Sequence, residues 1–294
     1  MNRPHLVFVA IIFLAALDAW LWQDVLAANS TPGITALDVG QGDATLAEFK
    51  SGATILTDTG PDTAILRALE PLLPRRNIDL VVLTHPQLDH YGGLRHLLGR
   101  YRIGAVLVNG RDGDSSTPGS LWRELMENLK ERDVPVIILR AGDRIKIGGE
   151  TMTFLGPDRN LIQSAELNDT GFVARLELSG FRTLLTADID EAGEAYLEKN
   201  LPPEFLRADL LKVAHHGSRF SSSDGFLRAV APKAVLIEVG KDNRFGHPTQ
   251  EALDRLLAIG ATIFRTDKNG TVKVTRTRSG VLSVKVARAT AGEE

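Results

Sequence analysis

Short apolar runs, each closed by a turn signal, recur along most of the chain. Runs of four to eight apolar residues bounded by Gly, Pro, Asn or Asp are typical of buried strands, whereas apolar residues spaced three and four apart indicate helices. Strands are predicted at residues 34–39, 44–49, 53–57, 78–83, 104–109, 134–139, 143–147, 151–155, 172–178, 181–186, 208–214, 234–239, 262–265, 271–275 and 281–286. Helices are predicted between residues 61 and 74, at 94–98, 121–132, 224–230 and 249–259, and after residue 190, with a long loop at 156–166. Strands in groups with helices interspersed favour two packed sheets with helices outside them.

A separate apolar segment occupies residues 6–22 and is preceded by Arg3 and His5. Its length is about that of one membrane span, and Trp20 and Trp22 would serve as an interfacial anchor. Residues 25–27 (Val-Leu-Ala) also fit a signal-peptide cleavage site, and a buried amphipathic helix is disfavoured because no polar face repeats. We predict that residues 1–28 form a hydrophobic helix that is a membrane anchor or a signal segment. The protein would then be membrane-anchored and extracytoplasmic, with secretion after cleavage as the alternative.

No linker interrupts residues 33–287, which we predict to be one catalytic domain, followed by a disordered tail at 288–294. Apolar residues make up 43% of the chain, which excludes wholesale disorder. The net charge of −3 does not favour a nucleic-acid partner. Cysteine is absent, so any metal must be held by His, Asp, Glu or amide side chains.

Candidate metal ligands gather in residues 84–93, directly after the apolar strand at 78–83. Pro86 ends that strand, and a Gly-Gly pair at 92–93 precedes the next helix. His85, Asp89 and His90 therefore lie on a loop at the end of a buried strand, where α/β proteins place their chemistry. Imidazole and carboxylate groups are ligands for Zn²⁺ and similar ions.

Three other apolar strands end in residues of the same kind. Asp58 follows residues 54–57, Asp188 follows 184–187, and the pair His215 and His216 follows 210–214. One such strand end would be an ordinary turn or cap, but four in one chain indicate strand ends gathered on one rim around metal.

The motifs that carry these residues resemble, in their order, the metallo-β-lactamase fold superfamily, and within it the extracytoplasmic hydrolase domain of the ComEC DNA-uptake proteins. The resemblance covers nearly all of residues 33–280 and rests on the segments 37–44, 58–60, 85–93, 184–189, 211–218, 246–248 and 265–267. It implies a mixed α/β (α+β) fold, a four-layer αββα sandwich, with one or two divalent metal ions (Zn²⁺ or Mn²⁺) at one edge.

The resemblance also implies roles for individual ligands. His85 would belong to the first metal site, Asp89 and His90 to the second, and Asp188 would bridge the two. Asp89 or Asp188 would also take part in catalysis by accepting a proton.

One of the two adjacent histidines would complete the second site. The His-Gly step favours His216 by similarity, whereas strand direction does not exclude His215; the other imidazole would face the substrate. Asp58 would orient a ligating histidine rather than bind metal. Ser218 and His247 are candidate substrate-binding residues.

Two positions depart from the superfamily pattern. Gln87 replaces its middle histidine, and Asn168 replaces the histidine of its third motif. Amide oxygens are poor ligands for Zn²⁺, so both would be weak first-site ligands. The first site is therefore depleted, which predicts one tight metal ion or a loose pair.

These features predict a metal-dependent phosphodiesterase or nuclease that acts outside the cytoplasm, attached to the membrane through residues 6–22. The substrate is a phosphodiester, with DNA as one candidate, and no protein partner is predicted. Basic residues that could contact such a polymer are Arg219, Arg228, Lys241, Arg244, Arg265 and Lys268. The alternative is a catalytically impaired binding protein of the same fold that retains one metal site. A β-lactamase is disfavoured because Gln87 and Asn168 remove histidine ligands.

Overall fold

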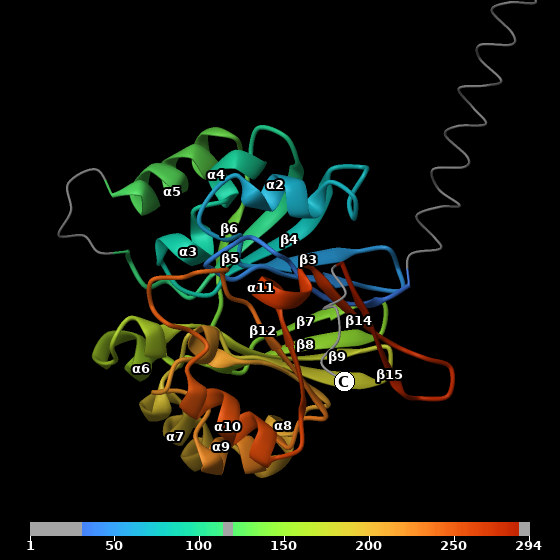
Figure 1. Cartoon of the computed structure of the whole chain (residues 1–294). Helices are drawn as coiled ribbons and strands as arrows, with labels where there is room; N and C mark the ends of the chain where they lie inside the picture. The colour runs from blue at the N-terminus through green and yellow to red at the C-terminus, as the bar shows by residue number, and fades with distance from the viewer. Residues whose placement is uncertain (1–30, 114–119, 288–294) are drawn as a thin grey trace, which may run out of the picture.

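Two β-sheets packed face to face, with helices on both outer sides, make up the computed structural model, which describes residues 31–113 and 120–287 (Figure 1). This arrangement confirms the mixed α/β architecture with two sheets. The predicted hydrophobic helix at residues 6–22 and the tail from residue 288 lie outside the described residues. Within the described ranges, no helix is long and apolar enough to cross a bilayer.

The first sheet has the strand order β15-β14-β1-β2-β3-β4-β5-β6. Strands β3 to β6 run parallel to one another, and the other neighbours are antiparallel. Their bounds are β1 Gly33–Ala36, β2 Thr45–Glu48, β3 Thr54–Thr57, β4 Asn77–Leu83, β5 Arg102–Val108, β6 Val136–Ile138, β14 Val272–Arg276 and β15 Leu282–Val286.

The second sheet has the order β13-β12-β11-β10-β9-β8-β7, with β10 to β13 parallel and β7 to β10 antiparallel. All four residues of β12 are buried, as its unbroken apolar run predicts for a parallel strand covered on both faces. The strand bounds are β7 Arg144–Ile147, β8 Glu150–Gly156, β9 Val173–Leu178, β10 Phe181–Leu185, β11 Leu210–Lys212, β12 Ala234–Ile237 and β13 Thr262–Arg265.

Helices cover the outer face of each sheet. On the first sheet lie α2 (Ala64–Leu69), α3 (Leu88–Tyr91), α4 (Leu94–Leu97) and α5 (Leu121–Glu131). On the second lie α6 (Arg159–Ser164), α7 (Glu191–Asn200), α8 (Pro203–Leu206), α9 (Asp224–Val230) and α10 (Gln250–Ala258). Single turns form α11 (Thr266–Asn269), η1 (Asn168–Thr170) and η2 (Ala214–Gly217).

Helix α5 illustrates how the sequence pattern produces this packing. Its hydroxyl cap is Ser120, which accepts a hydrogen bond from the backbone N–H of Arg123. Trp122, Leu125 and Leu129 recur at helical spacing and are buried against the first sheet. The helix therefore follows from its cap and its apolar stripe.

Several short helices are absent from the sequence prediction. Helix α6 lies inside the segment predicted as a loop at 156–166, where Asp158 caps it through the N–H of Leu161 at 2.8 Å. Helix α3 lies inside the metal-ligand motif, and α8 and α11 were also not predicted. Each spans one or two turns, which is too short for a helical period to show in the sequence.

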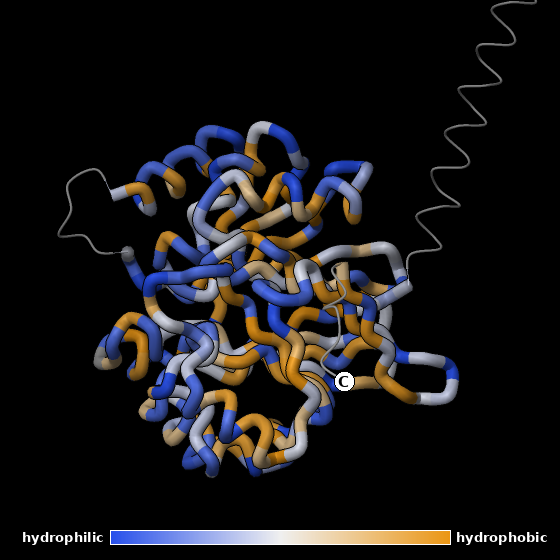
Figure 2. The backbone as a smooth tube through the Cα atoms, in the orientation of Figure 1, coloured by the Kyte–Doolittle hydropathy of each residue, from blue (hydrophilic) through white to orange (hydrophobic). Residues whose placement is uncertain are grey.

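Three apolar layers hold the sheets and helices together. The middle layer, between the sheets, contains Phe154 and Phe172, whose ring centroids are 4.8 Å apart at an interplanar angle of 60°. The outer layers join each sheet to its own helices. Figure 2 shows these apolar segments concentrated in the interior of the fold.

We expect Phe154→Ala to lower the free energy of unfolding by about 3–5 kcal/mol, because it opens a cavity between the sheets. Urea unfolding followed by circular dichroism measures this loss. Leu257→Ala is the control, since Leu257 is 60% exposed and should cost less than about 0.5 kcal/mol. Equal losses in the two variants would contradict this view of the core.

Candidate metal centre

The parallel strands of both sheets end at one edge of the sandwich, and polar residues follow these ends directly. The carboxyl ends of parallel strands are where α/β proteins assemble their sites. Asp58 follows β3, His85 to His90 follow β4, Asp188 follows β10, His215 and His216 follow β11, and Glu238 follows β12.

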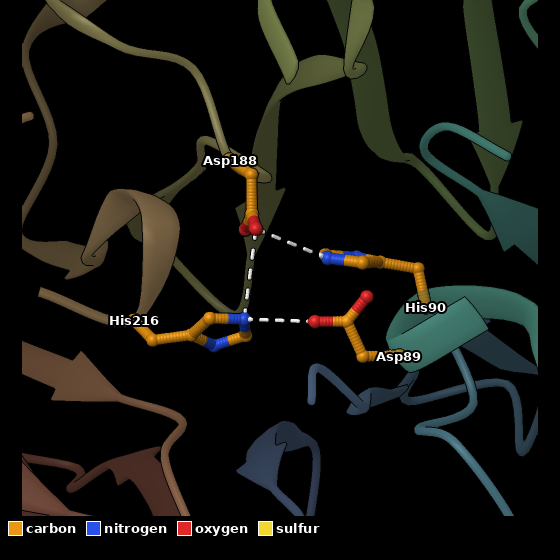
Figure 3. Close-up of side chains that lie close together, drawn as sticks. All are labelled: Asp89, His90, Asp188 and His216. Atoms are coloured by element: carbon orange, nitrogen blue, oxygen red, sulfur yellow. Dashed lines mark ion pairs between the residues drawn. The ribbon is translucent and has the colours of Figure 1, made fainter. Parts of the chain in front are cut away.

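Four of the predicted ligands come together at this edge (Figure 3). Asp89, His90, Asp188 and His216 each offer one ligand atom, and these atoms all lie within 4.8 Å of one another. The Nε2 of His90 is 3.3 Å from Oδ2 of Asp188, and the Nε2 of His216 is 3.4 Å from Asp89 and 3.5 Å from Asp188. We call these residues the four-residue cluster.

The ring orientation of both cluster histidines is set by their Nδ1 atoms. The Nδ1 of His90 lies 2.8 Å from the carboxylate of Asp58, and the Nδ1 of His216 lies 2.7 Å from the carbonyl oxygen of Glu238. Because both partners can only accept, each Nδ1 carries the hydrogen and the Nε2 faces the cluster. Carboxylate or carbonyl support of this kind is usual behind metal-binding histidines.

Unpartnered buried atoms indicate that the four-residue cluster suits a cation. Among the described residues, the Nε2 atoms of His90 and His216 and the Oδ1 of Asp188 are buried without a hydrogen-bond partner. Buried polar atoms are rarely left unsatisfied, since this costs free energy. Two imidazole nitrogens and two carboxylates match the donors of a Zn²⁺ or Mn²⁺ site.

The backbone is strained where it delivers these side chains. Asp58, Ala187, His215 and His216 all adopt left-handed conformations, with φ between 45° and 58°. Such conformations cost free energy in residues other than glycine and cluster at functional sites. The strain turns the chain sharply at three strand ends.

Mutual charge interactions shift the titration of the four-residue cluster. Burial by itself would lower the pKa of His216, but the charges of Asp188 and Asp43 raise it to about 10. Burial likewise opposes the shift at His90, where Asp188 and Asp58 hold the pKa well above its usual value. Burial would raise the pKa of Asp89, but the nearby imidazole of His216 and the charge of His90 lower it to about 2.

A buried lysine lies beneath the four-residue cluster and was not predicted. Lys212 forms an ion pair with Asp43, donates to the carbonyl oxygen of Ala187 at 3.2 Å, and lies 3.9 Å from Asp188. Burial would lower the pKa of Lys212, but Asp43 and Asp188 outweigh it and raise the pKa above the usual lysine value. In the sequence, this buried cation is marked by a single charged residue inside the apolar run that forms β11.

Glu238 completes this buried layer. Its carboxyl group accepts hydrogen bonds from the N–H of Ala44 at 3.0 Å and the hydroxyl of Thr45 at 2.7 Å. Burial, assisted by the charge of Asp43, raises the pKa of Glu238 to about 8, so it is largely protonated at neutral pH. Protonation removes one negative charge from a region already rich in carboxylates.

The residues predicted for a first metal site differ from the four-residue cluster. His85 is buried with its Nε2 unpartnered and its ring centroid 4.1 Å from that of His90. Burial, together with the charge of His90, lowers the pKa of His85 to about 3, so the ring is neutral. Gln87 donates from Nε2 to Oδ1 of Asn168 at 2.6 Å, so the two amides bind each other. His85 lies outside the four-residue cluster.

Of the remaining predicted residues, two line a cavity beside the four-residue cluster and one does not. His215 turns away from the cluster, with its Nδ1 2.9 Å from Asp190, and lines a cavity together with His247. Ser218 does not line this cavity: it is buried, and its hydroxyl accepts a hydrogen bond from the N–H of Phe220.

The cavity has a volume of about 680 Å³ and opens directly onto the four-residue cluster. A volume of this size suits a small-molecule or nucleotide ligand. It is lined by Gln41, Pro61, Gln87, Leu88, Asp89, Asn168, Asp188, His215, His216, Asn243, Arg244, Phe245 and His247.

Comparison with known proteins places this geometry in a family context. The family model described as the metallo-beta-lactamase superfamily matches residues 37–239. ComE operon protein 3 of Bacillus subtilis is 29% identical over 277 residues, which cover 87% of this chain and 34% of that protein. The competence protein ComA of Neisseria gonorrhoeae is 29% identical, covering 84% of this chain and 33% of that protein.

Recombination protein 2 of Haemophilus influenzae is also 29% identical, covering 82% of this chain and 28% of that protein. The chain thus spans about a third of the length of these relatives. These matches confirm the resemblance to ComEC-type hydrolase domains.

Solved structures show the same fold. The metallo-beta-lactamase fold protein YhfI of Bacillus subtilis superposes with a TM-score of 0.53 at 15% identity, covering 86% of this chain and 99% of that one. Igni18, a metallo hydrolase of Ignicoccus hospitalis, gives a TM-score of 0.50 at 13% identity over 87% of this chain and 99% of that one. At these identities the likeness concerns the fold alone.

We expect the affinity of the full chain for Zn²⁺ or Mn²⁺ to rise with pH between 6 and 9. The raised pKa values of His90 and His216 mean that a metal must displace protons, and each proton released steepens the dependence by up to about tenfold per pH unit. Competition with a chelator measures the affinity, and calorimetry in buffers of different ionisation enthalpy counts the protons. An affinity independent of pH in this range would contradict protonated histidines in the metal-free cluster.

We expect Lys212→Met to lower the free energy of unfolding by about 3–5 kcal/mol, because it removes the ion-pair partner of the buried Asp43 carboxylate. Chemical unfolding of the metal-free chain measures the loss. The matched control is Lys233→Met, which breaks a 2.8 Å pair with Asp209 but whose side chain is 74% exposed. That change should cost no more than about 1 kcal/mol. A loss at Lys212 as small as that at Lys233 would show that the buried pair contributes little.

Proposed function

The chain belongs to the metallo-beta-lactamase superfamily, and from this premise we propose that it is a metal-dependent hydrolase of phosphodiesters. The observation that carries the proposal is the convergence of Asp89, His90, Asp188 and His216, with their ligand atoms within 4.8 Å of one another. The donor set and the unpartnered Nε2 atoms support metal binding at this point. The paired amides of Gln87 and Asn168 favour one ion at the four-residue cluster over two equal sites.

A divalent ion bound there supplies a Lewis acid that lowers the pKa of water toward about 7 and neutralises charge on a phosphoryl oxygen. His90 and His216 hold their Nε2 atoms toward this point because Asp58 and the Glu238 carbonyl fix their Nδ1 atoms. Both carboxylates predicted to accept a proton line the cavity, and Asp89 is the more accessible, with its side chain 30% exposed against 2% for Asp188.

His215 has a separate task on the cavity wall. Burial opposes protonation of His215, but its hydrogen bond to Asp190 and the charges of Asp188 and Asp190 raise its pKa. The protonated ring can donate from Nε2 to a phosphoryl oxygen, and such fixed donors stabilise negative charge that develops during hydrolysis. This assigns the two adjacent histidines different roles, with His216 as ligand and His215 as substrate contact.

A nucleic acid is the phosphodiester that we propose as the physiological class. The relatives carry the names competence protein and recombination protein, and recombination is a process of DNA. Arg244 lines the cavity, and Arg219 follows the His215-His216 segment in the sequence. Arg265, in contrast, already forms an ion pair with Asp267 at 2.6 Å. We further propose that the chain acts outside the cytoplasm and is attached to the membrane through residues 6–22.

A non-catalytic binding protein is the second candidate, and the hydrogen bond between Gln87 and Asn168 favours it. Those two amides occupy the positions where the superfamily pattern has histidines, so the first metal site has lost its strongest donors. Under this reading the four-residue cluster binds one ion without turnover.

We expect the full chain to hydrolyse bis(p-nitrophenyl) phosphate when supplied with Zn²⁺ or Mn²⁺. Asp89→Asn and Asp188→Asn should each lose bound metal and at least about 100-fold in kcat/KM, because metal contributes several kcal/mol to such reactions. Metal content by mass spectrometry and release of p-nitrophenol measure the two effects.

His96→Ala is the control, because His96 lies on α4 away from the four-residue cluster. It should keep both metal and turnover. Metal bound by the unchanged chain without any turnover would favour the binding protein, and turnover unchanged in Asp89→Asn and Asp188→Asn would end the proposal for this site.

A further inference from the structure

The cavity beside the four-residue cluster is lined by both apolar and polar side chains. Pro61, Leu88 and the ring of Phe245 are apolar parts of this lining, and Phe245 is 52% exposed. An exposed aromatic ring that lines a cavity offers a flat apolar face on which a ligand can pack. The guanidinium of Arg244 lies over the Phe245 ring, 4.9 Å from its centroid, which adds a cation at the same place.

Side-chain amides form another part of the cavity lining. Gln41, Gln87 and Asn168 line the cavity, and each amide offers both donor and acceptor atoms. Gln41 is held in place because its Oε1 accepts a hydrogen bond from the N–H of Gly240 at 3.1 Å. Its NH₂ group supplies donors beyond that bond. A ligand that fills the cavity must therefore present polar edges as well as an apolar face.

The loop that presents Phe245 is braced from within. The Nδ2 of Asn243 donates to the carbonyl oxygens of Gly240 at 3.0 Å and His247 at 2.6 Å. Its Oδ1 accepts from the N–H groups of Phe245 at 3.2 Å and His247 at 3.0 Å. The aromatic ring is thus presented on a fixed turn, which lowers the entropy lost when a ligand packs on it.

The distance from this ring to the four-residue cluster is short. The ring centroids of Phe245 and His247 are 6.0 Å apart, and those of His247 and His216 are 6.5 Å apart. A single ligand can therefore reach from the cluster to Phe245. A nucleotide has this layout, because one sugar separates its phosphate from a flat base with polar edges.

We propose that this cavity is a nucleobase subsite, in which one base of a nucleotide packs on Phe245 while its phosphate lies at the four-residue cluster and Arg244. The inference rests on the proposed function, which it extends from phosphodiesters in general to nucleotides. Bases stack on aromatic side chains with little regard to sequence, and Arg strengthens such contacts. An alkyl chain fits less well, because it offers no hydrogen-bond partner to polar atoms of the lining such as the NH₂ group of Gln41.

Binding of two probes tests this subsite without any need for turnover. Thymidine 5′-monophosphate and 2-deoxyribose 5-phosphate share the sugar phosphate and differ in the base. We expect calorimetry on the full chain with Mn²⁺ to show roughly tenfold tighter binding of the nucleotide, the order that stacking on one aromatic ring supplies. Phe245→Ala should bring this ratio close to one, and Phe245→Trp should restore it.

Phe220 provides a matched control. It is 58% exposed and carries Arg219 over its ring at 4.8 Å, the same arrangement as at Phe245, but it does not line the cavity. Phe220→Ala should leave the ratio unchanged. Equal loss in both alanine variants would show a general surface effect and overturn the subsite.

The outcomes separate this inference from the proposed function. A ratio near one in the unchanged chain, or no measurable binding of thymidine 5′-monophosphate, overturns the subsite even if bis(p-nitrophenyl) phosphate is hydrolysed. If the nucleotide binds more tightly than the sugar phosphate, this preference depends on Phe245 and no hydrolysis is seen, the result supports the subsite and contradicts only the hydrolase proposal. Hexyl phosphate that binds as tightly as the nucleotide would assign the cavity to an alkyl ester instead.

Discussion

The structure depends on the compensation of charge in one buried region at the edge of the sandwich. Asp43, Asp58 and Asp188 are almost fully enclosed, and unpaired carboxylates in such surroundings would cost several kcal/mol each. Lys212 neutralises Asp43 by an ion pair, and the imidazoles of His90 and His216 lie beside the carboxylate of Asp188. Without a metal these imidazoles carry the compensating protons, and a divalent cation would take over that charge. Metal binding and the stability of the fold are therefore coupled through the same few residues.

The arrangement of the strands is what makes this concentration of charge achievable. Parallel strands in both sheets end at the same edge, so segments that are far apart in the chain contribute to one point. The left-handed backbone at Asp58, Ala187 and His216 then aims the side chains inward. The cost of those conformations is offset by the packed apolar layers on either side of each sheet. The packed core thus holds the strained turns in place, and these turns position the side chains of the site.

In the proposed hydrolase, selectivity would come from the loops around the cavity rather than from the four-residue cluster itself. The four-residue cluster alone would accept many phosphate esters, since its donors recognise charge and geometry only. The turn braced by Asn243 carries an aromatic face and a cation, and the amides in the cavity lining offer polar groups that a ligand could bind. This division, with the chemistry on strand ends and recognition on a loop, is common among enzymes built on rigid scaffolds.

Local patterns in the sequence determined the strands, the longer helices and the residue types of the site. The apolar runs are long enough to reveal the two sheets, and the spacing of His85, Asp89 and His90 marks one motif by itself. Short helices such as α6 escaped because one or two turns show no period. The tertiary structure alone decided which of His215 and His216 faces the four-residue cluster, because that choice follows from backbone angles rather than residue type. It alone decided that Lys212 pairs with Asp43, because these two residues lie 169 positions apart in the chain. It alone also decided that the Phe245 ring is exposed beside the site, because exposure depends on which residues the rest of the fold covers.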